Sequence, residues 1–373
     1  MTVLQAHWYA APHVGGIETH LEAIGPELTQ LGVPNLLLSG TRESGEQTGV
    51  RYEPALDRHA TGHDATRGMC ERLAALTPPP DVVHLHNLHV QDPERGAMVI
   101  AAMRTVWPGT PIMITVHNIG PAAAAAPVLG ACDAVYVPSP FIGSVLMRSH
   151  GIATHELPYS FPIAGPPTSV ADRSAGRVLA QPTRFTWWKG SFHSLAAVVG
   201  LLDGGARFTF VHAGATWKSA QAKWDPQADA LLPGLRESVD RWVGAGAIEF
   251  ARLTSAATMQ LMTDADVVVY PTVGTTDEGE PFGVAAWQAA ATGHPLILTR
   301  SGHLDVLASR YDASRVVETA SVESLAAAIR DGAEGRLPTA RSGLATEIHE
   351  SVRTCAAVHV EEYTRLNPSV GRR

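Results

Sequence analysis

The chain has 373 residues, a formal net charge of −8 and 45% hydrophobic residues. This length exceeds that of one ordinary hydrophobic core and therefore predicts two domains. The acidic balance gives no basic surface for nucleic acid, so we expect no nucleic-acid partner.

Cysteine usage and the first residues both favour a cytoplasmic protein. Cys70, Cys132 and Cys355 are far apart and have neither metal-site nor disulfide spacing, as is typical of a reducing compartment. The opening MTVLQAHWYAAP lacks the basic head and apolar run of a signal peptide. No apolar stretch has the length of a membrane span, so we expect no integral membrane segment.

Short apolar runs alternate with helical patterns in the first half of the chain. Strands are predicted at residues 2–7, 34–40, 81–86, 111–117 and 133–139. The clearest helical pattern runs from Gly15 to Gly32, with apolar residues on one stripe. Such alternation is typical of a parallel sheet with right-handed crossovers.

A proline-rich stretch at 157–170 predicts a linker between two similar α/β halves. Strands of the second half are predicted at residues 178–187, 207–214, 247–253, 264–272 and 294–300. A final helix is expected over about 339–363. The fold class is therefore α/β. The predicted domains are 1–160 and 161–345, followed by a C-terminal helix and tail, 346–373, that could cross back to the first domain.

Gly15 and Gly16 lie between the first predicted strand and the first predicted helix. A backbone without Cβ atoms allows a phosphate to approach, and the helix N-terminus supplies N–H groups and partial positive charge. The alternative is an ordinary tight turn, because the pair does not match the dinucleotide-binding fingerprint.

Arg184 and Lys189, in the stretch TRFTWWKG, follow the first predicted strand after the linker. Ligands of open α/β sheets bind at the carboxyl ends of strands. Two cations there could hold a diphosphate, the arginine as a fork and the lysine as a point charge. Surface charge is the alternative interpretation of an isolated pair.

Four histidines, His84, His86, His89 and His117, lie at predicted strand ends. A zinc site is one interpretation, but there is no HExxH pattern and no acidic residue nearby. We favour a hydrogen-bonding role for His117 at a sugar site, and we interpret some of the others as buried core histidines.

The stretch EGEPFGVAAWQAAATGHP, residues 278–295, predicts a helix preceded by an acidic residue. Phe282, Gly283 and Val284 are predicted to form its first turn, whose N–H groups have no intrahelical partner. Glu280 could accept hydrogen bonds from sugar hydroxyls, or it could simply cap the helix electrostatically. Gln288, two turns further on, could be a site residue or a polar core residue.

Taken in this order, the motifs resemble those of retaining glycosyltransferases with the GT-B fold, in which two Rossmann-like domains face a cleft. This group, family 4, includes bacterial glycosyl transferase group 1 enzymes and sucrose synthases. The motifs are the Gly-Gly loop, DVVHLH, TVHN, DAVYVPS, Arg-x4-Lys-Gly, DADVVVYPT and EPFGVAAWQAAATGHPLILT. They cover most of the chain.

The resemblance implies a donor site in the second domain. It assigns Arg184 and Lys189 to the diphosphate of a nucleotide sugar and Glu280 to the donor sugar. The backbone N–H groups of the next residues would serve sugar and phosphate; these residues are Phe282, Gly283 and Val284.

The resemblance also implies two contributions from the first domain. The loop of Gly15 and Gly16 would close over the diphosphate, and His117 would lie beside the donor sugar. No metal or other cofactor is expected, because the two cations and the helix N-termini would stabilise the leaving group.

Three departures from the family pattern bear on the donor. Gln288 stands where the family has a second glutamate that binds the nucleotide ribose, and Asn118 replaces the usual aspartate after the histidine. The loop TVGTTDEGEPFG is longer and more acidic than usual. The family assignment stands, but the identity of the donor stays open.

The expected function is transfer of a sugar, with retention, from a nucleotide diphosphate sugar such as a UDP-sugar to a small-molecule hydroxyl. Asp277 and Glu278 would suit a cationic acceptor of the aminocyclitol or aminoglycoside type, although solvated loop charge is the alternative. A nucleotide-sugar epimerase and a non-catalytic nucleotide-sugar binder are the other hypotheses, distinguished by product formation without an acceptor and by binding without turnover.

Overall fold

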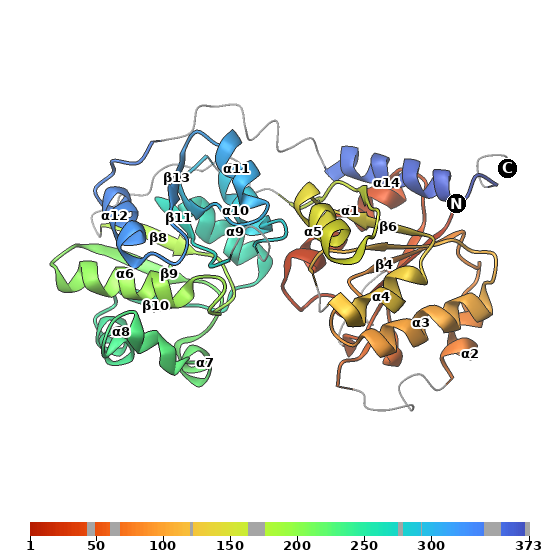
Figure 1. Cartoon of the computed structure of the whole chain (residues 1–373), viewed down its shortest axis with the longest axis horizontal. Coiled ribbons are helices and arrows are strands. Elements are labelled where there is room, and N and C mark those ends of the chain that lie inside the picture. The colour runs from red at the N-terminus through yellow and green to blue at the C-terminus, as the bar shows by residue number, and fades with distance from the viewer. Residues whose placement is uncertain are drawn as a thin grey trace. The chain divides into compact units, whose positions relative to one another are not determined.

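The computed structural model describes residues 1–42, 49–59, 68–119, 122–162, 176–274, 279–291, 293–338 and 352–369. The chain forms two compact units. Unit 1 comprises Met1–Pro162 and Glu350–Arg373, and unit 2 comprises Ile163–His349. Each unit contains one parallel sheet with helices packed against it (Figure 1).

The sheet of unit 1 has the strand order β3-β2-β1-β4-β5-β6-β7, and all pairs are parallel. Its strands are β1 (Val3–His7), β2 (Asn35–Ser39), β3 (Val50–Tyr52), β4 (Val82–His86), β5 (Ile112–Thr115), β6 (Ala134–Val137) and β7 (His155–Glu156). The five predicted strands are confirmed. The sequence missed β3 and β7, because two or three residues at a sheet edge carry too short a pattern to recognise.

Helices cover both faces of this sheet. They are α1 (Gly16–Gln30), α2 (Met69–Ala74), α3 (Pro93–Val106), α4 (Ala122–Gly130), α5 (Pro140–His150) and α14 (Val352–Leu366), with a 3₁₀ turn, η2 (Pro54–Leu56). Helices α2 to α5 share one hydrophobic core with the sheet, whereas α1 and α14 pack on the opposite face (Figure 1). The last helix ends at Leu366, three residues later than predicted, and the predicted helical residues 339–351 lie outside the described part of the chain.

The face of the sheet under α1 and α14 is rich in histidine. Strand residues alternate between faces, so Leu4 and Ala6 join the core beneath α2 to α5 while His7 turns to the other side. Neighbouring imidazole rings on this face have centroids 4.0–6.1 Å apart. This histidine layer consists of His7, His20, His84, His86, His117 and His359, all of them buried.

The sheet of unit 2 has the order β10-β9-β8-β11-β12-β13 and is also parallel. Its strands are β8 (Arg177–Gln181), β9 (Phe208–His212), β10 (Ile248–Phe250), β11 (Val267–Tyr270), β12 (Leu296–Thr299) and β13 (Ser314–Val317). The prediction missed β13, and it extended β8 too far because Pro182 follows Gln181 and has no N–H group for the ladder.

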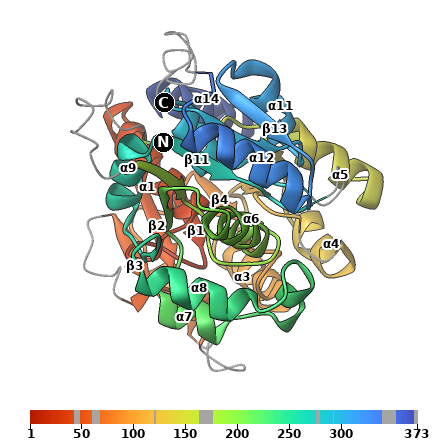
Figure 2. The same ribbon diagram turned by 90° about the vertical axis from the view of Figure 1, so that its left-hand side faces the viewer.

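The helices of unit 2 are α6 (Ser191–Asp203), α7 (Trp217–Ala222), α8 (Leu235–Gly244), α9 (Ser255–Asp264), α10 (Val284–Ala291), α11 (Leu304–Arg310) and α12 (Val322–Ala333), with a 3₁₀ turn, η3 (Pro226–Ala230). Helices α6 and α12 lie side by side over one face of the sheet, as two views show (Figures 1 and 2). Among the residues described, no helix combines the length and the hydropathy that a membrane crossing requires.

The histidine layer should make unit 1 sensitive to acid. Burial lowers the pKa of His20 to about 3 and that of His359 to about 4, and it lowers the pKa values of His84, His86 and His117 well below the ordinary value. The unfolded chain binds these protons near pH 6.5, so stability is complete above that pH and falls as the pH drops. His20 and His359 should each remove about 2 kcal/mol of stability between pH 7 and pH 5.

Urea unfolding of unit 1 at several pH values measures this slope. His359→Gln should lower the slope of stability against pH by the equivalent of about one bound proton. An identical slope for His359→Gln and the parent protein would contradict the assignment.

Candidate active site

The loop after β8 carries the two predicted cations of unit 2. Gln181 ends the strand, and its Nε2 donates to Thr183 Oγ1 at 3.2 Å and to the carbonyl of Lys189 at 3.0 Å. A Cβ atom on Gly190 would lie 2.0 Å from the carbonyl oxygen of Pro271, and this residue has a φ of +72°. The loop can therefore approach the end of β11 only with glycine at this position.

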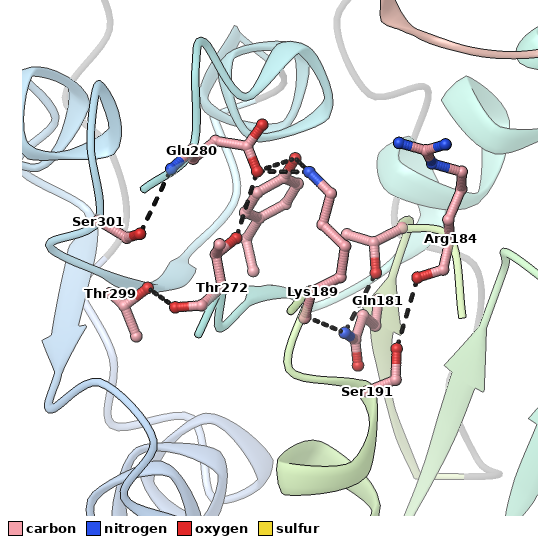
Figure 3. A network of polar contacts seen from close by, with 10 residues as sticks. Gln181, Arg184, Lys189, Ser191, Thr272, Glu280, Thr299 and Ser301 are labelled. Carbon is pink, nitrogen blue, oxygen red and sulfur yellow. Dashed lines mark hydrogen bonds and ion pairs between the residues drawn. The ribbon is translucent and has the colours of Figure 1, made fainter. Parts of the chain in front are cut away.

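Lys189 and Glu280 form a buried ion pair, although 91 residues separate them in the sequence (Figure 3). The Lys189 ammonium also donates to the hydroxyl of Tyr270 at 3.0 Å and lies 4.0 Å from the centre of the Trp188 ring. Burial lowers the pKa of Lys189, and the charge and hydrogen bond of Glu280 oppose that shift. The pair therefore keeps a buried cation at the carboxyl ends of β8 and β11.

Glu280 is held by side chains from two strand ends. Its Oε2 accepts hydrogen bonds from the hydroxyls of Tyr270 at 3.3 Å and Thr272 at 3.4 Å. Its backbone N–H donates to Ser301 Oγ at 3.4 Å, and its carbonyl accepts from the N–H of His303 at 2.9 Å. Tyr270 and Thr272 were missed from the sequence. They could have been found, because they stand at the end of a predicted strand, residues 264–272, and ligands of open α/β sheets bind at the carboxyl ends of strands.

Arg184 precedes Lys189 in the same loop and is exposed. Figure 3 shows its guanidinium extending on the same side of the loop as the Lys189 ammonium. Within the described part of the chain this guanidinium makes no ion pair, so a charged ligand would not have to displace a protein carboxylate from it.

The predicted helical turn after Glu280 begins later than expected. Helix α10 starts at Val284, so the prediction that Phe282 and Gly283 belong to its first turn is wrong. Gly283 has a φ of +83°, which lies in the left-handed region, and its carbonyl accepts from the N–H of Trp287 at 3.1 Å. The ring of Phe282 stacks on His303, with centroids 5.0 Å apart, and Gln288 is buried inside α10.

In unit 1 the Gly-Gly loop accommodates an acidic side chain. Gly15 is the N-cap of α1, and a Cβ atom there would lie 2.3 Å from Glu18 Oε2. Glu18 Oε1 lies 3.4 Å from Nε2 of His7. Burial acts to raise the pKa of Glu18, but the hydrogen bond and charge of His7 outweigh it and hold the pKa below its ordinary value. A side chain at position 15 would therefore displace the Glu18 carboxylate, and Gly16 begins the helix.

His117 lies just after β5, where the side chain of Asn87 fixes its backbone. Asn87 Oδ1 accepts from the N–H of His117 at 2.8 Å and of Asn118 at 3.1 Å, while Asn87 itself has a φ of 58°. Nε2 of His117 lies 3.1 Å from Nδ1 of His86. Because burial lowers the pKa of His117 well below its ordinary value, this side chain is neutral near pH 7 and acts as a hydrogen-bonding group.

The other histidines of the zinc interpretation have protein partners. His84 contacts Tyr363 Oη at 2.8 Å and Thr115 Oγ1 at 2.7 Å, and Nε2 of His89 contacts the carbonyl of Asn118 at 3.0 Å. In the described ranges, no group of three or more His, Cys, Asp or Glu side chains is arranged around a metal position. These contacts favour the interpretation of His84 and His89 as core residues.

The predicted site residues therefore fall into two groups. Unit 2 brings Lys189 and Glu280 into contact, with Arg184 in the same loop. Unit 1 places Gly15 and His117 at the carboxyl edge of its sheet. Asp277 and Glu278, the predicted acidic rim, lie outside the described residues.

Family models match both halves of the chain. A model described as Glycosyltransferase Family 4 matches residues 14–157, and one described as Glycosyl transferases group 1 matches residues 177–334. A search of curated proteins finds no match to the chain.

Solved glycosyltransferase structures resemble the whole chain. A glycosyltransferase from Rickettsia africae matches with 16% identity, a TM-score of 0.66 and 98% coverage of both chains. Sucrose-phosphate synthase from Thermosynechococcus elongatus matches with 16% identity, a TM-score of 0.67 and 99% coverage of both. HepE from Anabaena, solved with UDP and glucose, matches with 15% identity and a TM-score of 0.67, covering 100% of this chain and 98% of its own. At such identities the likeness establishes the fold.

Two parallel α/β units, the ordered motifs and the two family models agree, and the chain belongs to the group 1 glycosyltransferases with the GT-B fold.

Proposed function

We propose that this glycosyltransferase moves a sugar from a nucleoside diphosphate sugar to a hydroxyl of a small-molecule acceptor, with retention of the anomeric configuration and without a metal ion. The observation that carries the proposal is the pairing of Lys189 with Glu280 at adjacent strand ends. A cation suited to phosphate and a carboxylate suited to sugar hydroxyls lie side by side there, as a nucleotide sugar requires.

Arg184 and Lys189 provide the positive charge for the leaving diphosphate. Charge on the diphosphate grows in the transition state, and donors fixed in advance stabilise it more than water does. Each well-placed charge-assisted donor contributes about 2–4 kcal/mol in the transition state. These two cations would replace the function of a metal ion.

Retention is proposed from the family resemblance together with the chemistry of this chain. A front-face attack through an oxocarbenium-like state needs no protein nucleophile, and the departing phosphate takes the proton of the acceptor hydroxyl. Neutral His117 would contribute a hydrogen bond to the sugar without adding charge.

A UDP-sugar is the favoured donor, which is supported by the UDP and glucose bound to HepE, a protein of the same fold.

The acceptor class is proposed as a small natural product, with an aminocyclitol or aminoglycoside type as the specific candidate. Another protein of this fold, AviGT4, is involved in avilamycin A biosynthesis and matches with 19% identity, a TM-score of 0.60 and 98% coverage of both chains. The acidic residues Asp277 and Glu278 would favour a cationic acceptor.

A donor-by-acceptor screen by mass spectrometry, with chelator present, tests the proposal. UDP-sugars should give a glycosylated product with the donor's anomeric configuration, because no step depends on a metal ion. Activity that disappears with chelator and returns only with a divalent ion would contradict the metal-free mechanism. A changed sugar without an acceptor would identify an epimerase, and tight donor binding without turnover would identify a binding protein.

Removal of either cation should impair catalysis. Arg184→Ala or Lys189→Ala should lower kcat/KM by about a hundredfold or more, because each removes a donor to the leaving diphosphate. Arg236→Ala, at an exposed position on α8, is the matched control and should keep full activity. Steady-state kinetics measure the effect, and thermal unfolding verifies that each variant is folded. Near-normal kcat/KM in either site variant would remove that residue from the diphosphate site.

Gln288 should retain the ribose-binding role of the glutamate that it replaces. An amide can accept from one ribose hydroxyl and donate to the other, but without the strengthening that a carboxylate charge gives. A lost neutral hydrogen bond costs about 0.5–1.5 kcal/mol, so Gln288→Ala should raise the nucleotide Kd by roughly tenfold. Gln288→Glu should be tolerated or bind more tightly.

Titration with ribose and deoxyribose nucleoside diphosphates separates this role from packing. The parent protein should prefer ribose, and Gln288→Ala should lose that preference. If the alanine variant binds both nucleotides as the parent does, Gln288 is a packing residue.

A further inference from the structure

The Lys189 ammonium has three close neighbours in the protein. An ammonium group has three N–H donors. One pairs with Glu280, one donates to Tyr270 Oη at 3.0 Å, and the face of the Trp188 ring lies 4.0 Å away. A phosphate oxygen that binds Lys189 must therefore replace one of these three partners.

Glu280 is the partner that a phosphate would replace. Tyr270 ends a central strand and Trp188 adjoins Lys189 in the chain, so both are fixed by the fold. Glu280 is the only one of the three with a negative charge, and a phosphate beside it would be repelled. Thr272 Oγ1, 3.4 Å from Glu280 Oε2, would remain as a hydrogen-bond donor to the displaced carboxylate.

We propose, on the basis of the function proposed above, that Glu280 is an internal counter-ion of Lys189 and that the donor diphosphate displaces it. The displaced carboxylate accepts hydrogen bonds from the donor sugar. Tyr270 is the positioning residue of this exchange, because its hydroxyl contacts Lys189 at 3.0 Å and Glu280 at 3.3 Å. Figure 3 shows the second carboxylate oxygen of Glu280 turned away from Lys189.

The exchange gives the site a preference for the complete donor over its diphosphate product. A nucleotide sugar supplies both a phosphate for Lys189 and hydroxyls for Glu280. A nucleoside diphosphate supplies only the phosphate and leaves a buried carboxylate without a replacement partner, which is unfavourable. Once the sugar has left, Glu280 returns to Lys189 and competes with the diphosphate, which promotes product release.

Calorimetric titration with inorganic pyrophosphate and with UDP tests the competition directly. Glu280→Gln should bind both probes about tenfold more tightly than the parent, because the amide cannot form the ion pair and leaves Lys189 to the phosphate. The gain should vanish when Lys189→Gln is added. Glu237→Gln is the matched control, since it makes the same change at an exposed position on α8 and leaves the ion pair in place. It should show no gain.

Sugar-bearing donors give the second part of the test. Glu280→Gln should bind a UDP-sugar no more tightly than UDP, whereas the parent protein should prefer the UDP-sugar. Equal or weaker binding of pyrophosphate by folded Glu280→Gln would overturn the exchange. If thermal unfolding shows that Glu280→Gln does not fold, Glu280→Asp replaces it in the test. This variant keeps the negative charge but moves it one methylene further from Lys189. Its affinity for pyrophosphate should rise by a smaller factor, about threefold. A folded aspartate variant without any gain would overturn the exchange equally.

The outcome is separable from that of the proposed function. Pyrophosphate carries neither sugar nor base, so its titration does not depend on the donor's identity. Tighter pyrophosphate binding by Glu280→Gln, combined with no turnover of any nucleotide sugar, would support the exchange and reject the transferase reaction. Turnover of a nucleotide sugar without tighter pyrophosphate binding by Glu280→Gln would support the transferase reaction and reject the exchange.

Discussion

The buried ion pair between Lys189 and Glu280 constrains the rest of unit 2. Two charges removed from water are tolerated only when each compensates the other, and loss of one partner costs about 3–5 kcal/mol. The pair forms because β8 and β11 are neighbours in the sheet and because Gly190 lets the cation's loop approach Pro271. On the other side, a Cβ atom on Gly302 would lie 2.4 Å from the Glu280 carbonyl oxygen. Gly190, Gly302 and the strand order therefore all help to bring Lys189 and Glu280 into contact.

Unit 1 buries a layer of histidines, whereas unit 2 buries the ion pair of Lys189 with Glu280. Its histidine layer is kept largely neutral, since burial lowers the pKa values of His84, His86 and His117. A neutral imidazole needs hydrogen bonds but no counter-ion, so this layer can place His117 at the sheet edge without a compensating acid. His7 has different surroundings, because its Nδ1 lies 2.8 Å from the carbonyl of His86 and its Nε2 lies 3.4 Å from Glu18 Oε1.

Sequence patterns predicted the elements and motifs that show up as local periodicity or motif order. They missed the contacts that form only because particular strands are neighbours within a sheet. The central strands, the first helix and the family motifs were recognisable because each is a continuous pattern. The start of α10 was misplaced by two residues, since only the observed φ of Gly283 shows that it lies outside the helix. The contact of Lys189 with Tyr270 and Glu280 requires β8 beside β11, an order that no residue pattern encodes. The same holds for the histidine layer, to which α14 contributes from the far end of the chain.

The amide at position 288 can be understood from the charges around Glu280. The formal charges of Arg184, Lys189 and Glu280 sum to one net positive charge, because the loop carries two cations and Glu280 is one carboxylate. A second carboxylate at position 288 would strengthen the hydrogen bonds to the ribose, but it would also reduce that excess of positive charge near an anionic diphosphate. An amide can still hydrogen-bond ribose hydroxyls, although more weakly, and it leaves the positive charge available to the leaving group. In the proposed mechanism Glu280 already neutralises Lys189, so a neutral partner for the ribose would preserve the electrostatic stabilisation of the leaving diphosphate.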